Sequence, residues 1–269
     1  MRRGLNIPHA TNVHTTKSFM QFSPVPLHMV FEMLAYAAGF QIFLRERRRL
    51  ALPALTDPDR SVVVGVGAII GAALGAKLAF WIDDPLAAFA NFPDWRHLLE
   101  GKSIVGALLG GLIGVELAKR FAAIKESSGD AFVRPLAVGM MIGRVGCFLA
   151  GLSDHTYGNP TVLPWGVDFG DGIARHPTQL YEIVFLALWL WLLETRGSRL
   201  PRIGDCFRLF MTGYLLFRLL VDAIKPVPYG YAFGLSGIQL ICIAGLIYYL
   251  PQLPRIVRRI VSDELPTRG

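Results

Sequence analysis

Long apolar runs separated by short polar segments make up most of this chain. The runs predict seven transmembrane helices, at 25–44, 62–82, 103–119, 132–150, 178–194, 205–224 and 235–250. A helix of about 20 apolar residues crosses the roughly 30 Å hydrocarbon core of a bilayer. The pattern therefore predicts an all-α integral membrane protein, with residues 1–269 forming a single polytopic domain.

Two of the predicted helices carry glycines at a spacing of four residues. They are Gly67, Gly71 and Gly75 in the second helix, and Gly106, Gly110 and Gly114 in the third. This spacing places small residues on one helix face, where they allow two backbones to approach closely. We interpret both stripes as packing surfaces.

Composition supports a membrane protein, since 53% of the residues are hydrophobic and 17% are charged, against about 25% charged residues in soluble domains. In a soluble protein the net charge of +7 would suggest nucleic acid as a partner. Here we interpret it as basic cytoplasmic loops and expect no nucleic-acid binding. The cysteines Cys147, Cys206 and Cys242 lack metal-ligand spacing, and we expect neither a metal nor a cofactor.

Lysine and arginine are concentrated in loops on one side of the predicted helices. These loops are the segments 45–60, 119–134, 196–202 and 255–268. The positive-inside rule makes that side cytoplasmic. The N-terminus is then outside, the C-terminus is inside, and segment 151–177 is an exterior loop. The first 22 residues contain no apolar core and are not expected to be a cleavable signal peptide.

Charged residues inside the predicted helices gather at one depth, in the outer half of the bilayer. They are Glu32, Lys77, Arg144, Glu182, Arg218 and Asp222. Each charge costs roughly 2.5–3.5 kcal/mol at a helix centre, so it must pair or face a water-filled cavity. Pairing of Arg144 with Glu182, or of Arg218 with Asp222, is one interpretation. A polar chamber open to the outer leaflet better explains the common depth.

The cations of this predicted chamber indicate an anionic ligand. Arginine binds phosphate oxygens bidentately, so Arg144 and Arg218, together with Lys77, favour a phospholipid headgroup. A water-soluble anion is the alternative. Tyr214 and Asp222 share a helix face with Arg218 because the three are spaced by four residues.

The exterior loop adds a titratable group. The segment TYGNPTVLPWGVDFGDGIARHPTQLYE is rich in glycine and proline, which specify backbone turns. His176 lies near its end and can titrate near neutral pH. We interpret it either as a base or as a satisfied interface histidine.

These motifs resemble the phosphatidylglycerol–prolipoprotein diacylglyceryl transferase family. GRVGCF, YGNPTVLPWGV and RHPTQLYE are similar to its GRxGNF, WGRPT, PWG and HPSQLYE, and FRLLVD, PVPLH and GGLIG also look similar. The resemblance extends over nearly the whole chain. It implies an enzyme of the bacterial cytoplasmic (inner) membrane that moves a diacylglyceryl group from phosphatidylglycerol to the lipobox cysteine thiol of a prolipoprotein, releasing glycerol phosphate.

The resemblance also implies roles for single residues. Arg144 and Arg218 match the family's essential arginines, and Gly158 matches the glycine of WGRPT. The expected catalytic residues are Arg144, Arg218, His176, Asp154 and His155. The expected substrate-binding residues are Lys77, Tyr214, Asp222, Gly158, Glu182, Cys147 and Gln179.

The chain also departs from the family. Cys147 and Ala150 stand at asparagine positions, and the stretch SIVGALLGGLIG has Val105 or Leu109 where the family has a histidine. Asp154 or His155 is expected to replace the family's glutamate, and His176 its proposed base. Cys147 is interpreted as a small buried residue, with a covalent role as the alternative.

Other functions remain open at this point. The same lipid donor could serve a different acceptor, either a small molecule or another lipid. A non-catalytic phospholipid-binding protein and an anion transporter are further alternatives. A transporter would favour internal repeats and broken helices near the midplane, and the sequence shows no repeat.

Overall fold

The computed structural model describes residues 24–90, 101–197, 200 and 202–261. Residues 1–22, which are not expected to be a cleavable signal peptide, lie outside the described residues. Parts of the basic segments 196–202 and 255–268 also lie outside them.

Helices dominate the described chain. Its long helices are α1 (Pro24–Leu50), α3 (Pro58–Asp83), α6 (Ile104–Phe121), α7 (Val133–Ala150), α8 (Thr178–Arg196), α9 (Asp205–Val221) and α10 (Gly237–Tyr249). Shorter helices are α2 (Pro53–Thr56), α4 (Pro85–Phe89) and α11 (Leu253–Val261), and the 3-10 turns are η1 (Gly129–Phe132), η2 (Gly151–Asp154), η4 (Asp222–Ile224), η5 (Ala232–Gly234) and η6 (Leu250–Gln252). Each long helix overlaps one predicted span.

Four helical segments of the described chain are long and apolar enough to cross a membrane. They are Leu27–Leu50, Pro58–Asp83, Gly129–Asp154 and Gly237–Ile256. Helices α6, α8 and α9, with 18, 19 and 17 residues, are not among these four. The mostly helical membrane class is therefore confirmed, whereas the count of seven spans and the orientation stay predictions.

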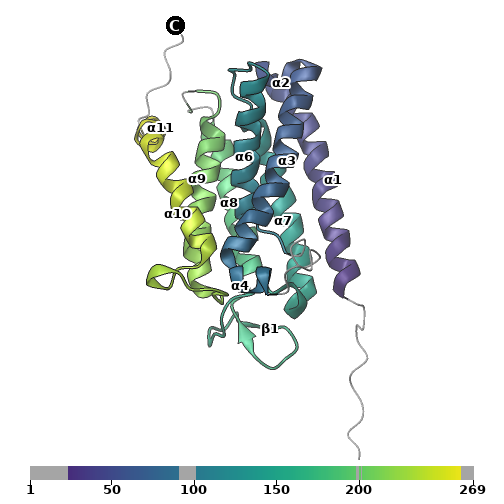
Figure 1. The fold of residues 1–269 in the computed structure, drawn as a ribbon, viewed down its shortest axis with the longest axis vertical. Coiled ribbons are helices and arrows are strands. Elements are labelled where there is room, and N and C mark those ends of the chain that lie inside the picture. Colours follow the sequence, from purple (N-terminus) through teal and green to yellow (C-terminus); the bar gives the residue numbers. More distant parts are fainter. Residues whose placement is uncertain (1–23, 91–100, 198–199, 201, 262–269) are drawn as a thin grey trace, which may run out of the picture.

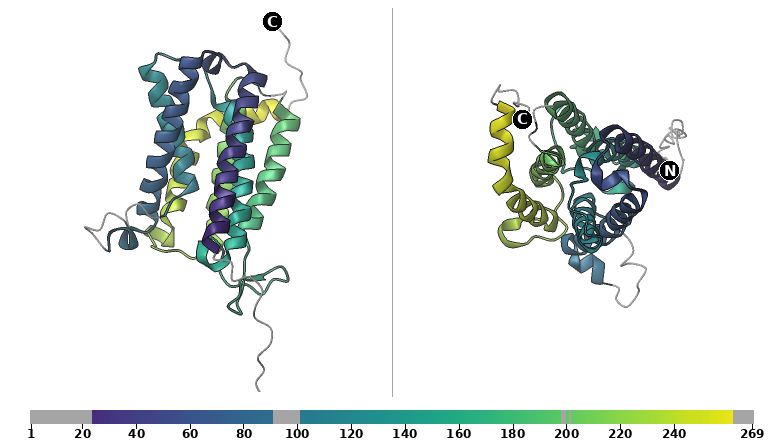
Figure 2. Two further views of the ribbon diagram at one scale, coloured as in Figure 1. Left: turned by 90° about the vertical axis from the view of Figure 1, so that its right-hand side faces the viewer. Right: turned by 90° about the horizontal axis from the view of Figure 1, so that it is seen from above.

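The long helices run side by side, with α1 and α10 on different edges of the bundle (Figures 1 and 2). Helix α3 packs on α6, α1 on α7, α7 on α8, and α9 on α10. Helices α2 and α11 lie at one end, and α4 lies at the opposite end with a small β-hairpin (Figure 1). The hairpin end is the one that the sequence predicts to be exterior.

The main apolar core surrounds α9 and includes residues of α6, α7, α8 and α10. Leu186, Phe210, Met211, Leu215 and Cys242 are fully buried there. Many large apolar side chains instead point away from the bundle, including Met33, Ile69, Trp191 and Leu220. An extensive apolar exterior is typical of a protein whose outer faces contact lipid.

The glycine stripes of α3 and α6 face each other, as the sequence predicts. A Cβ atom at Gly71 would collide with the backbone carbonyl of Gly110, and one at Gly75 with that of Gly106. A side chain at these positions would force the helices apart. The stripes are therefore packing surfaces.

We expect Gly71→Val to lower the stability of the protein in detergent. The added side chain overpacks the α3–α6 contact, and overpacking costs about 1–3 kcal/mol. Gly65→Val on the same helix is the matched control, because a Cβ there meets nothing within 4 Å. Thermal unfolding midpoints should fall for Gly71→Val and stay close to wild type for the control. Equal midpoints for the two variants would contradict this packing account.

The predicted exterior loop 151–177 has regular structure. It contains η2 and an antiparallel pair of strands, β1 (Val167–Asp168) and β2 (Ala174–Arg175), with Val167 opposite Arg175. The Asp168 Oδ1 atom accepts hydrogen bonds from the backbone N–H groups of Gly170, Asp171 and Gly172. This hairpin departs from the predicted all-α class. Its two short strands were not predicted because their alternating pattern is too short.

Candidate active site

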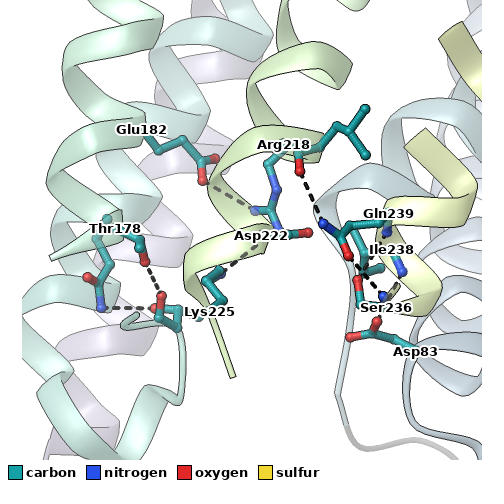
Figure 3. Close-up of polar contacts among 12 residues, drawn as sticks. Asp83, Thr178, Glu182, Arg218, Asp222, Lys225, Ser236, Ile238 and Gln239 are labelled. Carbon is teal, nitrogen blue, oxygen red and sulfur yellow. Dashed lines mark hydrogen bonds and ion pairs between the residues drawn. The ribbon is translucent and has the colours of Figure 1, made fainter. Parts of the chain in front are cut away.

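A buried carboxylate, Glu182 of α8, lies between two arginines from neighbouring helices. Arg144 Nε of α7 is 2.9 Å from Glu182 Oε2. Arg218 Nη1 of α9 is 3.3 Å from the same oxygen (Figure 3). Tyr214 donates its hydroxyl to Glu182 Oε1 at 2.8 Å. The exposed fractions are 3% for Glu182, 5% for Arg144 and 7% for Arg218.

A second carboxylate extends this network. Arg218 Nη2 lies 2.8 Å and 3.2 Å from the two oxygens of Asp222, and Lys225 Nζ lies 3.9 Å from Asp222 Oδ1 (Figure 3). We call Arg144, Glu182, Arg218, Asp222 and Lys225 the arginine–carboxylate network. With three cations and two carboxylates in their ordinary charge states, the network has a net charge of +1.

The spacing of side chains along α9 explains why this network forms. Tyr214, Arg218 and Asp222 follow one another at intervals of four residues and therefore share one face. That face meets the first turns of α8, where Glu182 lies, and the last turns of α7, where Arg144 lies. Four network residues thus come together at the hairpin end of the bundle, and Lys225 joins them through Asp222.

Both pairings suggested by the sequence are present, Arg144 with Glu182 and Arg218 with Asp222. Because these side chains are buried against each other, they do not line an open chamber in this conformation. Cavities of about 410 and 380 Å³ lie instead near the opposite ends of the helices, lined by residues that include Arg208 and Glu194. A lipid chamber at the network would require its ion pairs to separate, and it stays a prediction.

Gly158 lies where the exterior loop packs closely against the residues just after the end of α9. Its N–H donates to the His176 carbonyl at 2.8 Å, and the next residue, Asn159, donates to the Ile224 carbonyl at 2.8 Å. A Cβ at Gly158 would lie 2.8 Å from the Ile224 oxygen and 2.8 Å from the His176 Cβ. The geometry therefore explains the glycine by close backbone packing.

His176 and Gln179, the remaining predicted site residues of the loop and of α8, form hydrogen-bonding contacts with their neighbours. His176 Nδ1 lies 3.2 Å from the Tyr181 hydroxyl. Thr178 Oγ1 donates to the Thr156 carbonyl at 2.6 Å, and Gln179 Nε2 donates to Thr156 Oγ1 at 3.1 Å (Figure 3). Among the contacts of the described residues, none joins His176 to the arginine–carboxylate network.

Asp154 and Cys147 form a second cluster with His28 of α1, a residue that the sequence analysis did not select. His28 Nδ1 lies 3.3 Å from Asp154 Oδ1. Cys147 Sγ lies 3.8 Å from Arg144 Nη1, which links this cluster to the network. The side chain of His155 is exposed instead, beside Tyr157. Of the two candidates to replace the family's glutamate, Asp154 is therefore the one placed near the network.

Lys77 and Glu32 occupy other parts of the same end of the bundle. Lys77 donates to the Gly101 carbonyl at 2.6 Å. Glu32 accepts from the Tyr36 hydroxyl at 2.7 Å and pairs with Lys102. Their contacts lie along α1 and in the residues just before α6, and the common depth of these charges in the bilayer stays a prediction.

Lys225 follows α9 and gives the network a pH-dependent cation. Burial lowers the pKa of Lys225 to about 8, from an ordinary value of 10.5, and the nearby charge of Arg218 also lowers it. Between these pKa values the unfolded chain binds more protons than the folded chain. Lys225 therefore makes the folded state more stable as the pH rises from about 8 to 10.5.

We expect Lys225→Gln to remove this part of the pH dependence. Unfolding midpoints of wild type and variant, measured across that pH window, should differ in slope, with wild type gaining more stability as the pH rises. Parallel pH profiles would contradict the burial of this cation.

A helical chain with four candidate spans, an apolar exterior and buried ion pairs at one end is a membrane protein. The family profile described as prolipoprotein diacylglyceryl transferase matches residues 18–251. This chain belongs to the prolipoprotein diacylglyceryl transferase family.

Several phosphatidylglycerol–prolipoprotein diacylglyceryl transferases are similar to it. The protein of Geobacter sulfurreducens is 33% identical over 236 residues, covering 82% of this chain and 84% of the relative. That of Nitratidesulfovibrio vulgaris strain Miyazaki F is 35% identical over 238 residues, covering 81% and 86%. That of Clostridium tetani is 33% identical over 200 residues, covering 71% and 78%. No solved structure matches the chain.

Proposed function

We propose that this protein transfers a diacylglyceryl group from phosphatidylglycerol to the thiol of a prolipoprotein lipobox cysteine and releases glycerol phosphate. Its family and the names of its relatives support this reaction. The observation that carries the proposal is the buried pair Arg144 and Arg218, which meet at Glu182.

The network is suited to a phosphodiester. Phosphatidylglycerol carries one negative charge at its phosphate, which offsets the net charge of +1 of the network. Arg218 Nε is buried and makes no hydrogen bond to the described residues, so it is a donor available to a phosphate oxygen. A bound phosphate would compete with Glu182 for the arginines and would open the closed arrangement.

The transfer follows from this binding. The acceptor thiolate attacks the glyceryl carbon bonded to the phosphate ester oxygen, and a new carbon–sulfur bond forms. The carbon–oxygen bond breaks, and its electron pair goes to the oxygen of the departing glycerol phosphate. Arg144 and Arg218 would stabilise the negative charge that develops on this oxygen, as fixed donors do in a site shielded from water.

The membrane arrangement is part of the proposal. We place seven helices across a bacterial cytoplasmic (inner) membrane, with the N-terminus and the hairpin outside. The single polytopic domain then holds the network in the outer half of the bilayer, with the segment 151–177 above it. A phospholipid of the outer leaflet and an exported prolipoprotein could both approach from that side.

A different acceptor for the same lipid donor is the second candidate. Cys147 stands at an asparagine position of the family, and no histidine precedes GGLIG in α6. These departures alter the proposed base and an amide group of the family, whereas both arginines are present.

Release of glycerol phosphate tests the proposal. Purified protein is given phosphatidylglycerol labelled in its glycerol headgroup, with a lipobox peptide or with the matched peptide whose cysteine is replaced by serine. Release that requires the cysteine peptide supports the proposed reaction. Release that is independent of the peptide points to the second candidate. No release, under conditions where a Geobacter sulfurreducens relative works, contradicts both.

A further inference from the structure

Three metal-ligating side chains converge beside the arginine–carboxylate network. His28 of α1, Cys147 of α7 and Asp154 of η2 each present one ligand atom, and these three atoms lie within 4.8 Å of one another. Bonds of about 2.0–2.3 Å to a tetrahedral zinc ion place ligand atoms roughly 3.3–3.8 Å apart. His28 Nδ1 and Asp154 Oδ1 are already 3.3 Å apart, so only a small shift would complete the site.

The neighbours of this cluster are those that a metal site needs. A metal-binding histidine directs its other ring nitrogen toward a carboxylate, which fixes the ring. Glu32 Oε2 lies 3.8 Å from His28 Nε2, on the side of the ring away from Asp154. The second oxygen of Asp154 accepts a hydrogen bond from the Thr156 hydroxyl, which itself accepts from Gln179 Nε2.

We propose that His28, Cys147 and Asp154 bind one Zn²⁺ ion. One thiolate, one imidazole and one carboxylate are ligands that zinc accepts in tetrahedral sites. The two anionic ligands balance the charge of the ion, which suits a partly buried position near lipid. Arg144 Nη1, 3.8 Å from Cys147 Sγ, further stabilises the thiolate.

Three protein ligands leave the fourth position of a tetrahedral zinc ion open, as in catalytic zinc sites. The use of this position rests on the proposed function. There the thiol of the acceptor binds zinc as a thiolate and its proton passes to water, because a coordinating thiol is deprotonated. The bound sulfur then attacks the glyceryl carbon, and the thioether product leaves the ion.

This arrangement connects the two clusters through one residue. Arg144 contacts Cys147 on one side and Glu182 on the other. A thiolate held at the zinc ion would therefore lie beside the arginines that would hold the phosphate. The zinc site would supply the deprotonated acceptor although no histidine precedes GGLIG in α6.

Metal binding is tested first, without substrates. Protein purified in detergent is treated with a chelator and titrated with Co²⁺, which replaces zinc and gives a thiolate-to-cobalt absorption band. Zinc affinity follows from competition with a chromogenic chelator. We expect one equivalent of metal and a band that Cys147→Ser abolishes. Cys242→Ser, which alters another buried cysteine, should keep the band.

Two further variants test the geometry. His28→Ala should lower zinc affinity by more than 100-fold, and Glu32→Gln by about 10–100-fold, the usual cost of losing a carboxylate behind a metal-binding histidine. Absence of the band in wild type, or its persistence in Cys147→Ser, would overturn the metal site and leave a metal-free Cys–His–Asp cluster.

Its catalytic role is tested separately. Glycerol phosphate release that the chelator abolishes and Zn²⁺ restores supports the activation of the thiol by zinc. Unchanged release from metal-free protein would overturn this role while the proposed function stands. Zinc binding without any release would overturn the proposed function while the metal site stands.

Discussion

Replacement of Arg218 or Arg144 by alanine is expected to abolish glycerol phosphate release. Each arginine is a buried donor that would stabilise the charge on the departing phosphate, and loss of one such donor typically lowers the rate by about 10²–10³-fold. Lysine should not restore the rate at either position, because it lacks the planar bidentate geometry of guanidinium. Initial rates with the lipobox peptide measure the effect.

Arg208→Ala is the matched control for Arg218→Ala. Arg208 lies on the same helix but at its other end, and its partner Asp205 keeps a contact with Arg255. The control should retain its rate. Wild-type rates in both Arg144→Ala and Arg218→Ala, with all variants monodisperse in detergent, would show that the network is not the site of transfer.

Replacement of Glu182 by glutamine is expected to lower the stability of the protein substantially. The substitution keeps the volume but removes the charge on which Arg144 and Arg218 converge. Removing one partner of a buried ion pair costs about 3–5 kcal/mol, since an uncompensated charge stays buried. Denaturation in mixed micelles should therefore show a clearly lower midpoint.

Glu194→Gln provides the control on the same helix. Glu194 pairs with Arg134 at a position where both side chains are at least a third exposed, and exposed pairs contribute about 0–1 kcal/mol. A similar loss in the two variants would mean that burial of the Glu182 network does not matter for stability.

The sequence predicted the helices well because lipid imposes long apolar segments. Each of the seven predicted spans overlaps a helix, and the stripes at Gly71 and Gly110 meet as expected. The hairpin at Val167 and Ala174 was missed, because it forms through turn contacts of Asp168 within a glycine-rich segment. Such short strands leave no periodic pattern in the sequence.

The site was predicted in part. The common depth of the charges favoured a polar chamber, with pairing of Arg144 and Arg218 as the alternative, and the structure contains both pairs because unpaired charge is unfavourable in lipid. The sequence did not show that Glu182 would be shared by both arginines. His28 was missed as a site residue because its partners Cys147 and Asp154 lie more than a hundred positions away, so no local spacing indicates a metal. His176 was expected near the network but lies against Tyr181.

The central claim is tested most directly by the mass of a lipobox peptide after incubation with the purified protein and phosphatidylglycerol. The account predicts that the peptide gains one diacylglyceryl group on its cysteine sulfur, with no gain on the matched serine peptide and none with Arg144→Ala protein. An unmodified cysteine peptide, under conditions where a Geobacter sulfurreducens relative modifies it, would contradict the account.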